Sequence, residues 1–227
     1  MTTLQTPTDR METGDLADDR NARLLRVLGG LSLIATPLLF LGGAATSPPQ
    51  ADESASAYIA SLADDPFVSA VSANLFHYSW VLAAFGALAA IGLVRGRRGR
   101  TLTLWGGLAA AFGSIQFTGL LYSDWVLDAM GNRLDMDDAV AVFTHVTETA
   151  SISVWLLSAK LLGLLGFPVL FAGLARAGVI AWWLVPLALL PMIAFGVVGG
   201  VLGLVLGLAC YAPWFVTGLR LVQRGRL

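Results

Sequence analysis

The sequence predicts an all-α integral membrane protein that crosses the bilayer with six helices and keeps both termini in the cytoplasm. Of its 227 residues, 56% are hydrophobic and only 13% are charged, and the apolar residues are gathered in long runs. Such a composition is too apolar for an ordinary soluble domain. The runs are continuous instead of alternating at every second residue, which favours helices over a membrane β-barrel.

Six apolar segments reach or approach the roughly 20 residues that a helix needs to cross a hydrocarbon core of about 30 Å. They cover residues 24–45, 67–94, 101–122, 150–175, 178–196 and 198–219. The predicted organisation has three parts: a disordered, acidic cytoplasmic tail (1–22), a six-helix transmembrane domain (23–222) and a basic cytoplasmic C-terminus (223–227). The first segment is expected to be retained, because its apolar run is longer than a signal-peptide core.

The arginines predict the orientation of these helices. Twelve of the thirteen lie before or at the very start of the first segment, in the RGRRGR link (95–100), after the fourth segment or after the sixth. All twelve fall on the cytoplasmic side if both termini are inside, and only Arg133 falls outside. The positive-inside rule therefore predicts a multi-pass protein of the cell membrane with N-in, C-in topology.

Short helices are expected in the first and second external loops. In the first loop, ADESASAYIASLADD (51–65) offers Tyr58, Ile59 and Leu62 as apolar contacts. Asp65 and Pro66 then begin the next span as a cap followed by a first-turn proline. In the second loop, DMDDAVAVFTHVTETAS (135–151) starts with aspartates that suit a helix N-terminus, and we expect it to run directly into the fourth segment.

The stretch ADESASAYIASLADDP, an apolar helix that ends in GLVRGRRGR, and a helix that starts with WGG follow one another in this chain. This order resembles small multi-pass membrane proteins of actinobacteria, over roughly residues 24–122. The resemblance implies a helix count and a topology, and it transfers no site residue.

Lys160 is the only lysine, and it lies inside the fourth apolar segment, where a charge is costly. Its position about ten residues below the outer end of the segment places it roughly 15 Å deep. On a helical wheel, it shares a polar face with His145, Thr149 and Ser153. We therefore expect Lys160 to point into the bundle, either towards an outward-facing pocket or as a polar tie without chemistry; the alternative is snorkelling at the lipid surface.

Polar residues on several helices are candidates for the same pocket. The candidates are Lys160, His77, Tyr211, Asn74, Gln116 and Ser153, with Glu148, Asp124 and His145 at the pocket mouth. The carboxylates of the second loop outnumber its single arginine, so the mouth should be electronegative and favour a neutral or cationic ligand.

The sequence indicates no metal site and no cofactor. His145 and Glu148 share a helical face, but the chain has only two histidines and a single cysteine, Cys210. There is no phosphate-binding GxxxxGK[ST] motif, and RGRRGR is a short positive-inside loop instead of a nucleic-acid patch.

Three functions remain open. The favoured one is binding or moving a small or lipophilic molecule through the pocket. The second is a membrane-embedded enzyme in which Lys160, His77 and Tyr211 act as acid–base groups on a lipid or isoprenoid-like substrate. The third is a non-catalytic subunit that packs its glycine-rich helices against another membrane protein or a second copy of itself.

Overall fold

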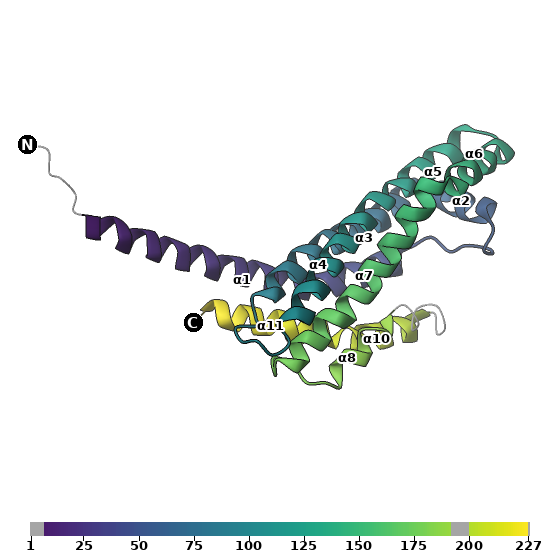
Figure 1. Cartoon of the computed structure of the whole chain (residues 1–227). Helices are drawn as coiled ribbons and strands as arrows, with labels where there is room; N and C mark the ends of the chain where they lie inside the picture. The colour runs from purple at the N-terminus through teal and green to yellow at the C-terminus, as the bar shows by residue number, and fades with distance from the viewer. Residues whose placement is uncertain (1–6, 192–199, 227) are drawn as a thin grey trace, which may run out of the picture.

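A computed structural model shows a helical chain and describes residues 7–191 and 200–226 (Figure 1). No strand occurs among these residues. In chain order the helices are α1 (Pro7–Thr46), α2 (Ala55–Asp64), α3 (Pro66–Ile91), α4 (Arg100–Leu120), α5 (Tyr122–Arg133), α6 (Met136–Glu148), α7 (Ala150–Arg176), α8 (Leu184–Leu187), α10 (Gly200–Cys210) and α11 (Ala212–Arg226). Helix α1 begins at Pro7, so most of the tail predicted to be disordered is helical, and residues 1–6 lie outside the described part.

Four helical stretches of the described chain are long and apolar enough to cross a membrane. They are Arg20–Thr46, Pro66–Ile91, Arg100–Arg133 and Ala150–Arg176. Helices α10 and α11, which meet at an angle of 45°, add a fifth if they count as one broken span. The chain is therefore an all-helical protein with four to five candidate membrane spans.

The predicted fifth helix over 178–196 is wrong for the part that is described. Helix α7 ends in a turn at Gly178, whose φ is 75°, and Val179 N–H donates to Leu174 O. Helix α8 is only 4 residues long, and residues 192–199 lie outside the described part. The left-handed glycine stops α7, and prolines 186 and 191 interrupt the next run; a sufficient apolar length does not by itself make a helix.

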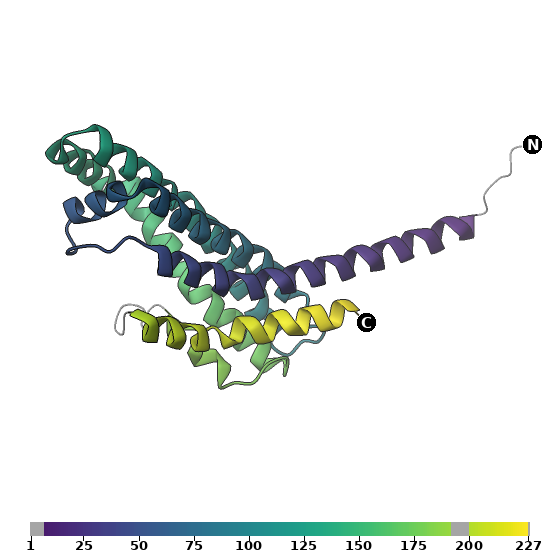
Figure 2. The same cartoon turned by 180° about the vertical axis from the view of Figure 1, so that it is seen from behind.

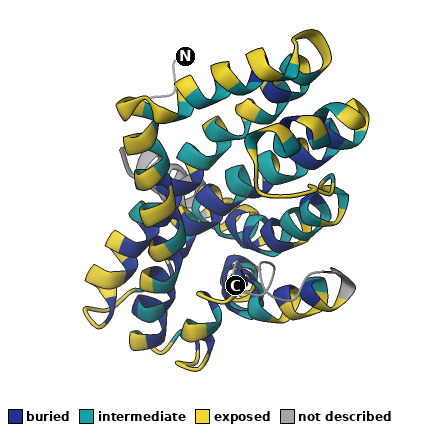
Figure 3. Ribbon diagram, turned by 90° about the vertical axis from the view of Figure 1, so that its right-hand side faces the viewer, coloured by how far each residue is buried: buried dark blue, intermediate teal, exposed yellow. Residues whose placement is uncertain are grey.

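Helices α1, α3, α4 and α7 form a row in which each is antiparallel to the next. Glycines bring the neighbours close: a Cβ on Gly86 of α3 would lie 2.4 Å from Leu33 Cγ of α1. Buried positions face inward between the helices and exposed positions face outward (Figure 3). On the outward face of α7, Val154, Leu157 and Leu165 are 67%, 59% and 51% exposed, which suits contact with lipid.

The C-terminal helices cover the side of this row that lies between α1 and α7. Helix α11 runs antiparallel along α1 (Figure 2), and a Cβ on Gly30 would lie 2.5 Å from the Gly218 carbonyl oxygen. Helix α8 contacts both α7 and α11. We call residues 184–191 and 200–226 the C-terminal cover. Its bend at Tyr211 precedes Pro213, which lacks the N–H that would continue the α10 ladder.

Helices α2, α5 and α6 pack together as a cap at the end of the bundle opposite the RGRRGR loop (Figure 1). Ile59, Leu62, Leu127 and Ala139 are buried in its own small core. At 1.5 Å per residue the 21 residues of α4 are about 32 Å long, the length that a span of the bilayer needs without α5.

The predicted start of the second span is confirmed: Asp65 Oδ1 accepts from Phe67 N–H and Val68 N–H, and Pro66 opens α3. The short helix predicted within 51–65 is present as α2. The expectation that the second loop runs straight into the fourth segment is wrong, because Thr149 has an extended ψ of 129° and separates α6 from α7.

Candidate functional site

A cavity of about 50 Å³ lies between the helix row and the C-terminal cover. Its walls come from α1, α3, α7, the turn after α8 and the junction of α10 with α11. The space exceeds the roughly 10–15 Å³ that one water needs, and it is large enough for a narrow part of an apolar molecule.

Aromatic rings dominate the walls of this cavity. On one side, the Phe40 ring lies 6.1 Å from Trp80 and 5.9 Å from Tyr211. On the other, the Trp214 ring lies 5.0 Å from Tyr211 and 5.0 Å from Phe167. These contacts join α1, α3, the C-terminal cover and α7 through edge-to-face and tilted packing, which aromatic rings prefer.

Few polar groups reach the cavity. Ser79 Oγ donates to Thr36 O at 3.0 Å and is thereby occupied. The buried Nε1–H of Trp214, in contrast, has no acceptor within the described residues. A buried donor without an acceptor is costly, and a ligand oxygen would satisfy it. The cavity is therefore an apolar, aromatic site, and Trp214 of its wall carries a buried donor that has no acceptor within the described residues.

Tyr211 is the predicted pocket residue that lines this cavity. His77 and Gln116 are half-buried elsewhere on α3 and α4: Gln116 Oε1 accepts from Ser158 Oγ at 2.8 Å, and His77 Nδ1 is buried with no partner among the described residues. Asn74 and Ser153 are exposed. The predicted pocket residues therefore do not converge on one place.

The prediction that Lys160 points into the bundle is wrong, because Lys160 is exposed on α7. The helical wheel that placed it on an inner face assumed one helix from His145 to Lys160, and the break at Thr149 changes that phase. Lys160 is sixteen residues, or about 24 Å, from Arg176 along α7. If Arg176 lies at one edge of a hydrocarbon core of about 30 Å, Lys160 lies near the other edge, within reach of the headgroups, as the snorkelling alternative expects.

The residues predicted at the pocket mouth belong to the cap. His145 and Glu148 are exposed on α6. Asp124 is half-buried, and Tyr58 Oη donates to its Oδ1 at 2.6 Å. Burial, and then the Asp124 charge, raise the pKa of Tyr58. This pair ties α2 to α5 and does not form an entrance.

No group of three or more His, Cys, Asp or Glu residues that could hold a metal ion occurs within residues 7–191 and 200–226.

Four ring residues of the site were not among the predicted pocket residues: Phe40, Trp80, Phe167 and Trp214. A helical wheel does not separate them from ordinary core or lipid-facing aromatics. The usable signal was Pro213, which predicts a break beside Tyr211 and Trp214 in the last apolar segment.

No family model matches the chain. No curated protein matches it. No solved structure matches it either.

Proposed function

We propose that this protein is a multi-pass membrane protein that binds a small lipophilic molecule in the aromatic cavity beneath the C-terminal cover. The observation that carries the proposal is the aromatic cavity together with Trp214 Nε1–H, which has no acceptor within the described residues. Binding sites for small molecules are typically apolar and aromatic, with few polar groups that fix orientation.

The depth of the cavity supports a ligand that arrives from the bilayer. Phe167 is nine residues from Arg176, or about 14 Å along α7. Trp214 is ten residues from Arg224, or about 15 Å along the C-terminal cover. Both distances are about half of a hydrocarbon core of about 30 Å. A molecule that partitions into the membrane reaches this depth without crossing a polar barrier.

The chemistry of the walls defines the ligand class. A narrow alkyl or isoprenoid-like chain suits the small aromatic space, and one carbonyl, ether or hydroxyl oxygen would accept from Trp214 Nε1–H. Such a ligand is neutral, in line with the preference for a neutral or cationic ligand expected from the sequence.

The other two functions have less support. An enzyme would need Lys160, His77 and Tyr211 together, but only Tyr211 lines the cavity. A partner subunit would present its glycine-rich face outward. In this structure the backbone of α7 already packs against Gly106 and Gly113 of α4.

The proposal includes the N-in, C-in topology. Arg224 Nη1 donates to Leu93 O, so α11 ends beside the end of α3, and arginines gather there. Cysteine accessibility at positions 10, 98, 130 and 224 tests the topology. Labelling of 98 from the outside, or of 130 from the inside, would overturn it.

Photo-crosslinking tests ligand binding. The probes are a diazirine-bearing fatty methyl ester and the corresponding diazirine alkane, added to the protein in nanodiscs. We expect both probes to label the walls of the cavity. Trp214→Phe keeps a ring but removes the N–H, so it should reduce labelling by the ester about two- to ten-fold and leave the alkane unchanged.

Two further variants complete this test. Ala188→Leu fills the cavity from the turn after α8 and should reduce labelling by both probes. Trp183→Phe is the matched control, since Trp183 is 65% exposed outside the cavity. Labelling that both Trp214→Phe and Ala188→Leu leave unchanged would refute the proposal.

A further inference from the structure

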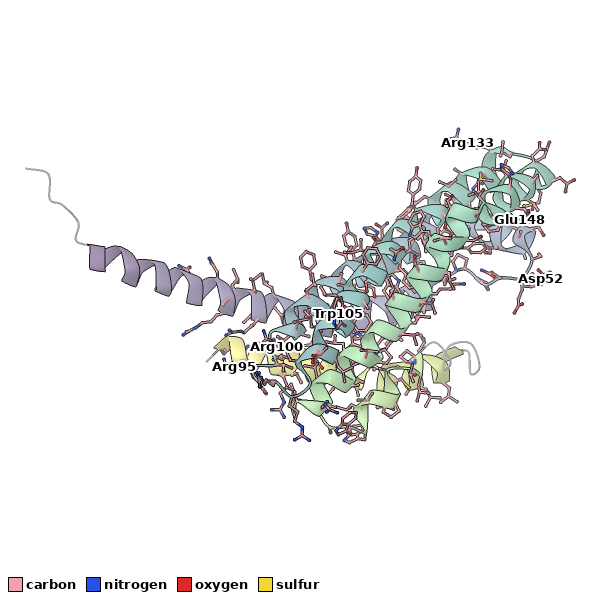
Figure 4. The ribbon with its side chains drawn as sticks, viewed as in Figure 1. Asp52, Arg95, Arg100, Trp105, Arg133 and Glu148 are labelled. Atoms are coloured by element: carbon pink, nitrogen blue, oxygen red, sulfur yellow. The ribbon has the colours of Figure 1, made fainter. Side chains whose placement is uncertain are left out.

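Charge is strongly separated along this molecule. None of the fifteen acidic residues lies within residues 66–123 or 149–227. Residues 66–123 and 149–227 contain the arginines at one end of the bundle, including Arg95 and Arg100 (Figure 4). The acidic residues Asp52 and Glu148 lie at the other end, beside the cap (Figure 4). The acidic segment 9–19 belongs to the part of α1 that extends away from the bundle (Figures 1 and 2). Helices α3, α4, α7 and α11 carry no carboxylate that could offset the positive charge of the arginine end.

Two hollows lie side by side at the arginine end and share Arg98 as a wall. The first, of about 330 Å³, lies between the start of α4 and Arg176 at the end of α7, with Arg97 beside it. The second, of about 240 Å³, lies between the chain after α3 and Arg224 of α11. The bond from Arg224 Nη1 to Leu93 O fixes the position of that guanidinium. Arg95 also lines the second hollow, so five arginines face two adjoining hollows, each large enough for a phosphate group.

The backbone adds donors to the first hollow. Helix α4 begins after Gly99 without a side-chain cap. The amides of Thr101 and Leu102, both of which line the hollow, belong to the first turn, where N–H groups have no partner inside the helix. These dipoles favour an anion at the same place as the arginines.

The surroundings of the first hollow place it at the level of lipid headgroups. Trp105 lies on the next turn of α4 and is 64% exposed, and Trp182 after α7 is 57% exposed. Exposed tryptophans of this kind mark the membrane interface. Leu102, 41% exposed, continues the wall of the hollow towards Trp105 and offers an apolar path for an acyl chain.

We propose that the hollow between Arg98 and Arg176 binds the phosphate group of an anionic phospholipid, whose acyl chain runs along Leu102 and Trp105. Guanidinium groups pair with phosphate oxygens in a two-pronged geometry, and the headgroup supplies the anion that the neighbouring helices lack. This site is separate from the aromatic cavity and does not depend on it.

Native mass spectrometry of the full chain tests the lipid site. The protein is released from nanodiscs that contain equal amounts of phosphatidylglycerol and phosphatidylcholine, and the retained lipids are counted. We expect phosphatidylglycerol to be retained preferentially. Arg98→Gln should reduce that preference about five-fold, and Arg98→Gln with Arg176→Gln should reduce it further. Both residues are exposed, so these changes leave the packed core untouched.

Two controls separate a built site from general charge. Arg98→Lys keeps the charge but loses the two-pronged geometry, so its preference should fall between wild type and Arg98→Gln. Arg133→Gln removes an exposed arginine from the cap and should change nothing. Equal retention of both lipids by the wild type, or equal effects of Arg98→Gln and Arg133→Gln, would overturn the proposal.

Inorganic phosphate distinguishes the two sources of the anion. If the hollow is a lipid site, millimolar phosphate should leave the retention of phosphatidylglycerol nearly unchanged, because the acyl chain contributes to binding. Displacement of the lipid by phosphate, dependent on Arg98, would overturn the assignment to a lipid and leave a site for free phosphate.

Discussion

The α4–α7 pair and the C-terminal cover are two ways of packing helices in one membrane bundle. Along α4 and α7, backbones touch: a Cβ on Gly113 would lie 2.0 Å from Gly163 N, and one on Gly166 would lie 2.3 Å from Ala110 N. The cover instead meets α7 through large rings, with Trp214 4.7 Å from Phe171. The first contact brings the two backbones together, and the second borders a cavity.

The difference follows from side-chain size and helix continuity. Small residues let two straight helices approach closely, and dispersion contacts then hold them together without a hydrophobic driving force. A bent segment cannot follow a straight neighbour along its whole length, so bulky rings fill the wedge incompletely. In this molecule the close-packed pair provides a rigid wall, and the aromatic contact provides the binding site.

The largest effect is expected from Gly113→Leu, which tests the close contact between α4 and α7. A side chain at this position meets the α7 backbone, which has no alternative rotamer to adopt. We expect a loss of more than about 4 kcal/mol of stability, seen as loss of the monodisperse peak in size-exclusion chromatography. The matched control is Gly42→Leu on α1, where the nearest atom to an added Cβ is 3.5 Å away. Equal behaviour of the two variants would contradict close packing of α4 and α7.

A smaller but still large effect is expected from Phe171→Ala at the contact between α7 and the cover. Phe171 is 0% exposed and packs against Trp214. Its removal should cost about 3 kcal/mol and raise the labelling of Cys210 by a thiol reagent, because the cover loosens. Thermal unfolding and the labelling rate measure the two effects. A lowered melting temperature without faster labelling would show that the cover does not depend on this ring.

The sequence predicted much of the fold and little of the candidate site, for a physical reason. Four apolar segments became long helices because apolar length, end arginines and the Asp65–Pro66 start all favour the same result. The segment over 178–196 has the same apolarity, but Gly178 and Pro186 override it.

The side-chain directions predicted from the sequence were wrong for a related reason. The predicted direction of the Lys160 side chain assumed that one continuous helix passes through Thr149. A single extended residue at Thr149 is enough to rotate the positions after it relative to those before it. The cavity depends on the angle at Tyr211 and on which rings of separate helices meet. Neither is encoded in the periodicity of a single segment.

The cap offers a reference region whose stability depends on neither contact. Tyr58→Phe removes the hydroxyl that donates to the half-buried Asp124, which should cost about 1–2 kcal/mol at neutral pH. The pKa of Tyr58 is raised, so the neutral phenol is the form that the fold favours. Its contribution should be complete below pH of about 10 and decline as the pH rises further. Melting temperatures of wild type and Tyr58→Phe should therefore converge above that pH; a constant difference would contradict the assignment.

The smallest effect is expected from Lys160→Met, which tests whether the outward face of α7 is inert. Lys160 is exposed, and neither the cavity nor the α4–α7 contact uses its side chain. Replacing it with an apolar residue of similar length removes a charge from the lipid surface, so stability should change by less than about 0.5 kcal/mol or rise slightly. Labelling of the cavity by the ester probe should be unchanged, in contrast to Trp214→Phe. The measurement is the melting temperature together with the crosslinking yield. A marked drop in crosslinking would mean that Lys160 affects ligand binding in the cavity. That result would contradict the assignment of an inert outward face to α7.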